Sequence, residues 1–191
     1  MGLVEREEVI GELERLYRDC LKGKSSVALI SGVAGSGKTA LLYAFSEWAI
    51  NSGAVVLSAT AFRAEEALPL GIIDQLFGDR HLDSSLAEPA RQLLDDCVLI
   101  PMPTAHQLES VAQATASAFE GLRRLLVDFA ENVPVVISVD DVENSDSLSL
   151  QCLQYLARRT KPSRILIVLS ESTPAWSTNS RLHTEIGRAH V

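Results

Sequence analysis

The sequence predicts an α/β fold in which a parallel sheet is buried between layers of helices, and three observations support this. First, four short runs are almost wholly apolar, as expected of strands that are covered on both faces. They span residues 26–31, 54–58, 135–139 and 165–169. Second, the intervening segments carry apolar residues at helical spacing. Third, a glycine-rich turn follows the first run and opens a helix, which gives a strand–helix–strand unit.

Amphipathic helices are expected on either side of the strands. Their apolar residues recur every three to four positions, with charged residues between them. The expected helices cover about residues 9–21, 41–49 with an end near Gly53, 70–77, 86–97, 108–132 and 147–159. Pro101 and Pro103 break the chain between the fourth and fifth of these helices.

Length and composition indicate one folded domain and exclude several classes of protein. The chain has 191 residues, of which 47% are hydrophobic and 22% are charged, and its formal net charge is −8. Without a cluster of Lys and Arg, we expect no direct binding of nucleic acid. No apolar run is long enough for a membrane span, and no secretory signal is visible, so we expect a cytoplasmic protein. The isolated cysteines are expected to be reduced thiols at buried helix faces: Cys20, Cys97 and Cys152.

The turn after the first strand matches the phosphate-binding pattern G-x-x-x-x-G-K-[ST] in full. It reads Gly32-Val33-Ala34-Gly35-Ser36-Gly37-Lys38-Thr39. Glycines let the backbone fold tightly enough to aim several N–H groups at one phosphate chain, and the helix that follows adds its positive end. In this pattern Lys38 reaches the terminal phosphates and the Thr39 hydroxyl binds Mg²⁺. The loop therefore predicts a site for ATP with Mg²⁺.

An acidic pair closes the third apolar run. Because ligands of open parallel sheets lie at the carboxyl ends of the strands, Asp140 should point toward the phosphate site. A carboxylate there can hold Mg²⁺, and Asp141 can then orient or deprotonate an attacking water. Acidic residues after a strand are common in turns, and the pair gains its meaning from the loop.

With these motifs the chain resembles the N-terminal ATPase domain of large ATP-binding LuxR-type transcriptional regulators, which are STAND ATPases within the AAA-like P-loop class. The resemblance runs from about Leu3 to Glu185. Besides the loop it rests on Leu3-Val4-Glu5-Arg6, Leu68-Pro69-Leu70-Gly71-Ile72-Ile73-Asp74-Gln75-Leu76-Phe77, Val139-Asp140-Asp141-Val142 with Asp146, and Leu169-Ser170-Glu171-Ser172. The loop and acidic pair are shared by the whole P-loop superfamily, whereas the Leu-Pro-Leu-Gly segment indicates this branch.

The resemblance implies a three-layer domain with strand order 5-1-4-3-2 and a nucleotide-dependent switch. In such regulators a C-terminal helix-turn-helix, which this chain does not include, binds DNA. Within the opening segment, Arg6 is expected to contact the nucleotide. Relatives often carry a His-Trp pair just after the acidic pair, where this chain has Glu143 and Asn144, so Glu143 becomes a second candidate for positioning water. Where many STAND proteins end the fourth strand with an arginine, this chain has Ser170 and Glu171.

Three functions stay open from the sequence. The first is a regulatory module that binds ATP and ADP, hydrolyses ATP slowly and self-associates. The second is a P-loop kinase for a small molecule or nucleotide, although no Arg-rich lid is visible between the loop and the acidic pair. The third is a module that binds nucleotide without turnover.

The last residues suggest that the ATPase domain, residues 1–185, is incomplete at its C-terminus. Residues 186–191 read Ile-Gly-Arg-Ala-His-Val, which a common sequencing adapter encodes when it is read through. We therefore expect these six residues to be an artefact and the fifth strand to be missing through truncation. The strand at residues 26–31 would then have an open edge, which favours aggregation.

Overall fold

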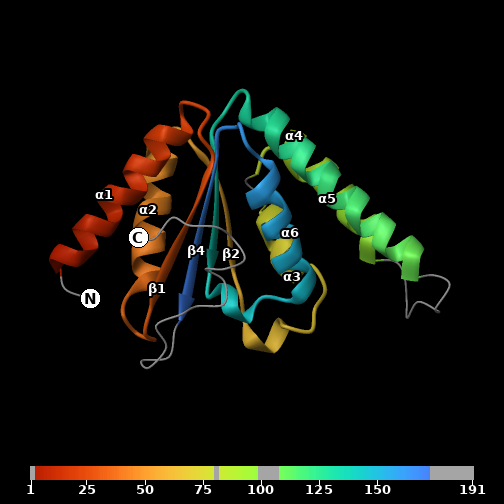
Figure 1. Cartoon of the computed structure of the whole chain (residues 1–191), viewed down its shortest axis with the longest axis horizontal. Helices are drawn as coiled ribbons and strands as arrows, with labels where there is room; N and C mark the ends of the chain where they lie inside the picture. The colour runs from red at the N-terminus through yellow and green to blue at the C-terminus, as the bar shows by residue number, and fades with distance from the viewer. Residues whose placement is uncertain (1–2, 80–81, 99–107, 173–191) are drawn as a thin grey trace.

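One parallel sheet of four strands forms the centre of the molecule (Figure 1). The computed structural model describes residues 3–79, 82–98 and 108–172. The strand order is β1-β4-β3-β2, and every neighbouring pair is parallel. The strands are β1 (Ser26–Gly32), β2 (Val55–Thr60), β3 (Val135–Asp140) and β4 (Ile165–Ser172). This confirms the 1-4-3-2 part of the expected order, and among the described residues β1 pairs with β4 alone.

Helices cover both faces of the sheet and make it the middle of three layers (Figure 1). One face is covered by α1 (Leu3–Cys20) and α2 (Lys38–Asn51). The other is covered by α3 (Gly71–Gly78), α4 (Ser84–Val98), α5 (Leu108–Ala130) and α6 (Ser147–Arg159). Two single-turn 3₁₀ helices, η1 (Arg63–Glu65) and η2 (Val142–Asn144), lie in the connections after β2 and β3.

Two hydrophobic cores, one on each face of the sheet, hold the layers together. Successive side chains of a strand point to opposite faces, so Val135 and Ile137 of β3 join the core under α3 and α6 while Val136 joins the core under α2. All six residues of β3 are buried, as its continuous apolar run predicts. The three-layer α/β fold expected from the sequence is confirmed.

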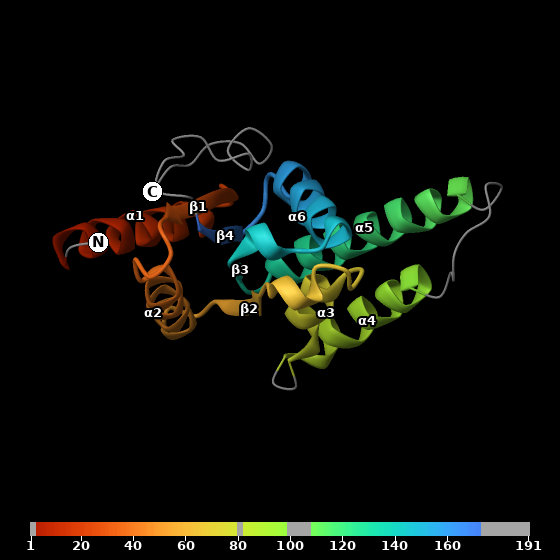
Figure 2. The same cartoon turned by 90° about the horizontal axis from the view of Figure 1, so that it is seen from below.

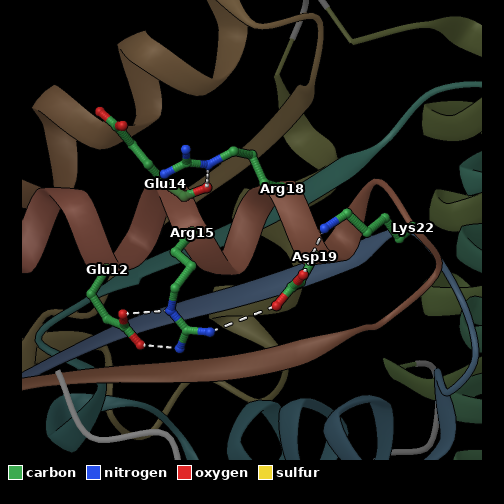
Figure 3. A network of polar contacts seen from close by, with 6 residues as sticks. All are labelled: Glu12, Glu14, Arg15, Arg18, Asp19 and Lys22. Atoms are coloured by element: carbon green, nitrogen blue, oxygen red, sulfur yellow. Dashed lines mark hydrogen bonds and ion pairs between the residues drawn. The ribbon is translucent and has the colours of Figure 1, made fainter.

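Helix α1 begins at Leu3, six residues before the predicted start at Val9. The preceding residues are mostly charged and show no apolar periodicity, but acidic side chains in a first turn favour the positive end of a helix. Along its outer face, Figure 3 shows Arg15 between Glu12 and Asp19, with the pair to Asp19 at 3.7 Å. Such exposed pairs stabilise a helix by a few tenths of a kcal/mol each, about 0.3–0.5.

The inner face of α1 buries the thiol of Cys20, which makes a testable prediction. Cys20 is fully buried, and burial raises the pKa of its thiol to about 12. Because the thiolate is the reactive species, we expect Cys20 to resist iodoacetamide at pH 8 in the folded chain and to react after denaturation. Peptide mapping by mass spectrometry reads this out, and rapid labelling of Cys20 in the folded chain would show that α1 does not pack as described. Cys152 is also buried, whereas the side chain of Cys97 lies outside those described.

Among the described residues, no helix has both the length and the apolar character that crossing a membrane requires.

Candidate nucleotide-binding site

The glycine-rich loop connects the end of β1 to the first residue of α2, as the sequence predicts. Gly35 and Gly37 have positive φ angles of 77° and 92°, in the left-handed region that favours glycine. The spacing of these glycines therefore follows from the backbone. Helix α2 begins immediately after Gly37, so its free N–H groups and positive end face the loop.

Lys38 lies folded into the loop. Its side chain is buried, and Nζ donates to the carbonyl oxygens of Gly32 and Val33 at 3.2 and 3.3 Å. A third bond, of 2.9 Å, runs to the Ser172 hydroxyl at the end of β4. All three acceptors are neutral oxygen atoms, and an anion in the loop would give the ammonium group a stronger, charge-assisted partner.

Arg6 reaches the loop from the first turns of α1. A Cβ atom built on Gly37 would lie 2.9 Å from Arg6 Cζ and 3.5 Å from Nε, which means that the guanidinium occupies the space beside Gly37. Arg6 Nε and the Ser36 hydroxyl are both buried without a hydrogen-bond partner. Such unpaired groups are costly, about 1–3 kcal/mol each, and anionic oxygen atoms in the loop would satisfy them. The loop thus fits a phosphate chain.

The acidic pair lies at the carboxyl end of β3, next to β4. The buried carboxylate of Asp140 accepts a short hydrogen bond from the Ser170 hydroxyl. The same hydroxyl oxygen accepts the backbone N–H of Asp141 at 3.0 Å. Asp141 has a φ angle of 51°, uncommon for a residue other than glycine, and Ser170 therefore holds the turn as well as the carboxylate. Asp140 and Thr39 line one cavity of about 300 Å³.

Ser172 connects the remaining predicted residues. Its hydroxyl, which bonds Lys38, lies 3.5 Å from Asp141 Oδ1, and its backbone N–H donates to Glu143 Oε1 at 2.9 Å. Ser170 and Ser172 were not predicted as site residues because the predicted fourth strand ends at its last apolar residue, Leu169. In the structure β4 continues to Ser172, and polar residues at the carboxyl end of a strand between β1 and β3 were the available signal.

The described residues hold no group of three or more His, Cys, Asp or Glu side chains placed to bind a metal ion. Mg²⁺ commonly takes one or two protein ligands and completes its shell with substrate phosphates and water. Thr39 and Asp140 line one cavity, which fits a Mg²⁺ site with two protein ligands.

The segments that carry the finer resemblance contact each other next to the acidic pair. Asp146 Oδ1 accepts the backbone N–H of Leu70 at 2.9 Å and also that of Ser149, which caps α6. Leu70 has a φ angle of 61°, and the buried Asp146 carboxylate holds this unusual turn. The Leu-Pro-Leu-Gly segment is therefore fixed to the connection that follows the acidic pair.

A parallel 1-4-3-2 sheet whose first strand leads through a complete phosphate loop into a helix defines a nucleotide-binding P-loop module. The sequence matches the AAA ATPase domain family over residues 2–168, and the chain belongs to that family. No curated protein matches the chain.

Two solved structures are similar to the chain at low sequence identity. PCH-2 of C. elegans is 15% identical with a TM-score of 0.54, and the match covers 99% of this chain and 42% of that one. DnaA from Aquifex aeolicus with bound AMPPCP is 15% identical over 96% of this chain and 43% of its own, with a TM-score of 0.40. The chain thus spans less than half of either protein's length. At this level of identity the likeness to PCH-2 shows a shared fold alone.

Removing the Ser170 hydroxyl should disturb the acidic pair. Ser170→Ala leaves the part-buried Asp141 N–H and one oxygen of the buried Asp140 without their partner, and we expect it to cost about 1–3 kcal/mol in the free energy of unfolding. The same change should reduce the gain in ATP affinity on adding Mg²⁺. Ser25→Ala is the matched control, since it removes a buried hydroxyl bonded to Thr160 at the opposite end of the sheet. Equal Mg²⁺ dependence in both variants would show that Ser170 does not position Asp140.

Proposed function

We propose that the chain binds MgATP in the loop of residues 32–39 and acts as the nucleotide switch of a larger LuxR-type transcriptional regulator. The observation that carries the proposal is the pair of unsatisfied polar groups, Arg6 Nε and Ser36 Oγ, beside the buried ammonium group of Lys38. Three donors, two of them cationic, face one loop in a chain whose net charge is −8. A polyphosphate supplies the negative oxygen atoms that such an arrangement requires.

In this proposal Lys38 binds the terminal phosphates, after its bonds to Gly32, Val33 and Ser172 are exchanged for phosphate oxygens. The Thr39 hydroxyl and the Asp140 carboxylate bind Mg²⁺, which neutralises charge between the phosphates. Arg6 adds a second cation from α1. Because Arg6 belongs to a different element from the loop, the position of the first turns of α1 then depends on which nucleotide is bound.

Hydrolysis is proposed to be slow. Asp141 and Glu143 are the candidates for orienting water, but both are held by Ser172 at the end of β4. A carboxylate oxygen that already accepts a hydrogen bond has one lone pair fewer with which to orient water. When Lys38 turns to a phosphate, the Ser172 hydroxyl loses its contact with Lys38 and can rotate away from Asp141, which frees that carboxylate oxygen for water.

Substitution of the two carboxylates tests the hydrolytic step. We expect Asp141→Asn to leave MgATP affinity within about twofold and to reduce turnover at least tenfold, because an amide cannot accept the proton of the attacking water. Glu143→Gln is the matched control, with a smaller expected effect. Phosphate release under single-turnover conditions measures both variants. If only the Glu143 variant loses turnover, the roles are reversed, and if neither does, the carboxylates take no part in hydrolysis.

The regulatory part of the proposal rests on the Leu-Pro-Leu-Gly segment and its bond to Asp146. A switch must present different conformations with different nucleotides. We therefore expect limited proteolysis to give different cleavage patterns in MgATP and in MgADP, with Lys38→Ala insensitive to both. Identical patterns at saturating nucleotide would argue against a switch. Incubation of the chain with labelled ATP and a panel of nucleosides tests the kinase alternative, since a labelled nucleotide product would replace released phosphate.

A further inference from the structure

A second cavity lies between α5 and α6, in the layer of helices on the face of the sheet opposite α2. Its volume is about 640 Å³, roughly twice that of the cavity beside Thr39. In Figure 2, α5 lies between α4 and α6 and extends outward beyond α6. Because the described residues that line the cavity all belong to α5 and α6, we call it the α5–α6 groove.

The wall formed by α5 is apolar and mostly made of small side chains. Val111, Thr115 and Phe119 are spaced four residues apart along α5, about one turn each, and Ala112 and Ala116 lie beside them. From Val111 to Phe119 this wall is roughly 12 Å long, a little over two turns of helix. Small side chains along a helix let the backbone of another helix approach closely, because ridges of side chains then fit into its grooves.

The other wall, formed by α6, ends in positive charge. Leu148 and Tyr155 continue the apolar surface, and Arg158 and Arg159 follow at the C-terminal end of the helix. The Arg159 guanidinium lies 5.0 Å from the centre of the Tyr155 ring. Among the described residues, the lining of the groove contains these two arginines and no Asp or Glu, although the chain as a whole has a net charge of −8.

Glu120, which accepts a hydrogen bond from the groove residue Tyr155, is paired with cations outside the groove. Glu120 accepts hydrogen bonds from Arg123 and Arg124 at 2.8 Å and from the Tyr155 hydroxyl at 2.9 Å. These partners hold the pKa of Glu120 well below its usual range, with Arg123 as the main cause. Glu120 therefore stays ionised at neutral pH, and its charge is balanced by Arg123 and Arg124.

We propose that the α5–α6 groove binds an acidic amphipathic helix of a partner protein. Its apolar side would lie against Ala116 and Phe119, and its carboxylates would face Arg158 and Arg159. An apolar floor with charge at one end is the recognition surface expected for a helix in a groove, whereas a phosphate backbone would find few charges along the remaining length. Helix α6 leads from the carboxyl end of β3 back to the amino end of β4, and the two arginines are at the end of α6. They therefore lie at the opposite end of the sheet from Lys38, and this site is separate from the loop.

A display library of amphipathic helices of about 16 residues tests the proposal. The apolar positions are kept as Leu and Ala, and the polar positions sample Glu, Gln and Lys equally. Selection for binding to the full chain should enrich Glu at one end of the helix. Selection against the Arg158→Glu/Arg159→Glu variant should enrich Lys at the same positions, and helices chosen on the unmodified chain should bind that variant at least tenfold more weakly. No charge preference, or a preference unchanged by the reversal, would overturn the proposal.

Two further variants show where the selected helices bind. Ala116→Arg places a large side chain on the exposed face of α5 and should abolish binding while MgATP affinity and thermal unfolding stay unchanged. Arg18→Glu reverses one charge on the exposed face of α1, outside the groove, and should have no effect. Binding that survives Ala116→Arg places the helices elsewhere and refutes the site. Competition by random duplex DNA would also refute the proposal, because it identifies nucleic acid as the occupant. A concentration-dependent dimer that Ala116→Arg disrupts, with no helix selected, would identify a second copy of the chain as the occupant.

Discussion

Replacing Lys38 by alanine should weaken MgATP binding by about tenfold to more than a hundredfold. The side chain is buried in the loop, and its ammonium group makes three hydrogen bonds to neutral oxygen atoms that a phosphate would replace. Loss of a hydrogen bond to a charged group costs about 1.5–3 kcal/mol, which corresponds to this range of affinity. Isothermal titration calorimetry measures the change directly.

The matched control for this variant is Lys22→Ala. Lys22 is exposed at the end of α1, where it pairs with Asp19 at 3.2 Å, so its removal changes the net charge equally without touching the loop. Affinity for MgATP should be the same as in the unmodified chain. If Lys38→Ala behaves like Lys22→Ala, the ammonium group is not a phosphate contact.

Replacing Gly37 by alanine should weaken nucleotide binding on the order of a hundredfold, for two separate reasons. At a φ angle of 92°, any residue with a Cβ atom is strained, by roughly 1–2 kcal/mol. The added Cβ would also displace the Arg6 guanidinium from its place beside the loop. Because the arginine is proposed as a second cation for the phosphates, the variant should lose that contact together with the loop geometry.

A double-mutant cycle separates the two causes. If Arg6 contributes as proposed, Gly37→Ala should cost about tenfold less affinity in an Arg6→Ala background than in the unmodified chain, because the contact is already absent. Gly23→Ala is the control for backbone strain alone, since Gly23 has a φ angle of 80° and open space around it. It should lower the free energy of unfolding by roughly 1 kcal/mol and leave MgATP affinity unchanged. Full additivity of Arg6→Ala and Gly37→Ala would mean that the guanidinium does not act through the loop.

The apolar centres of the strands could be predicted from the sequence, but their polar ends could not. Runs such as Val135 to Val139 are buried on both faces, so hydrophobicity alone locates them. Ser170 to Ser172 belong to β4 because they pair with β1 residues in register, a contact between segments far apart in the chain. The local sequence pattern carries no information on such pairing. For that reason the two serines, which contact the acidic pair as well as Lys38 and Glu143, were not predicted as site residues.

The loop itself was predictable because its chemistry depends on consecutive residues. Gly35, Gly37 and Lys38 act through local backbone geometry, and their spacing is visible in the sequence. The place of Arg6 beside Gly37 depends instead on how α1 packs against α2, which the pattern of α1 does not specify. Only the family resemblance made Arg6 a candidate, and its nucleotide contact remains a prediction.

The most direct test of the account is calorimetric titration of the unmodified chain with ATP, first with Mg²⁺ and then with excess EDTA. We predict saturable binding at a single site, weakened when Mg²⁺ is removed because Thr39 and Asp140 then lose their connection to the phosphates. The dissociation constant for MgATP should lie well below about 1 mM, the value that corresponds to a binding free energy of about −4.1 kcal/mol. Absence of saturable binding at that concentration, in a chain that unfolds cooperatively, would contradict the proposal that this P-loop domain binds MgATP.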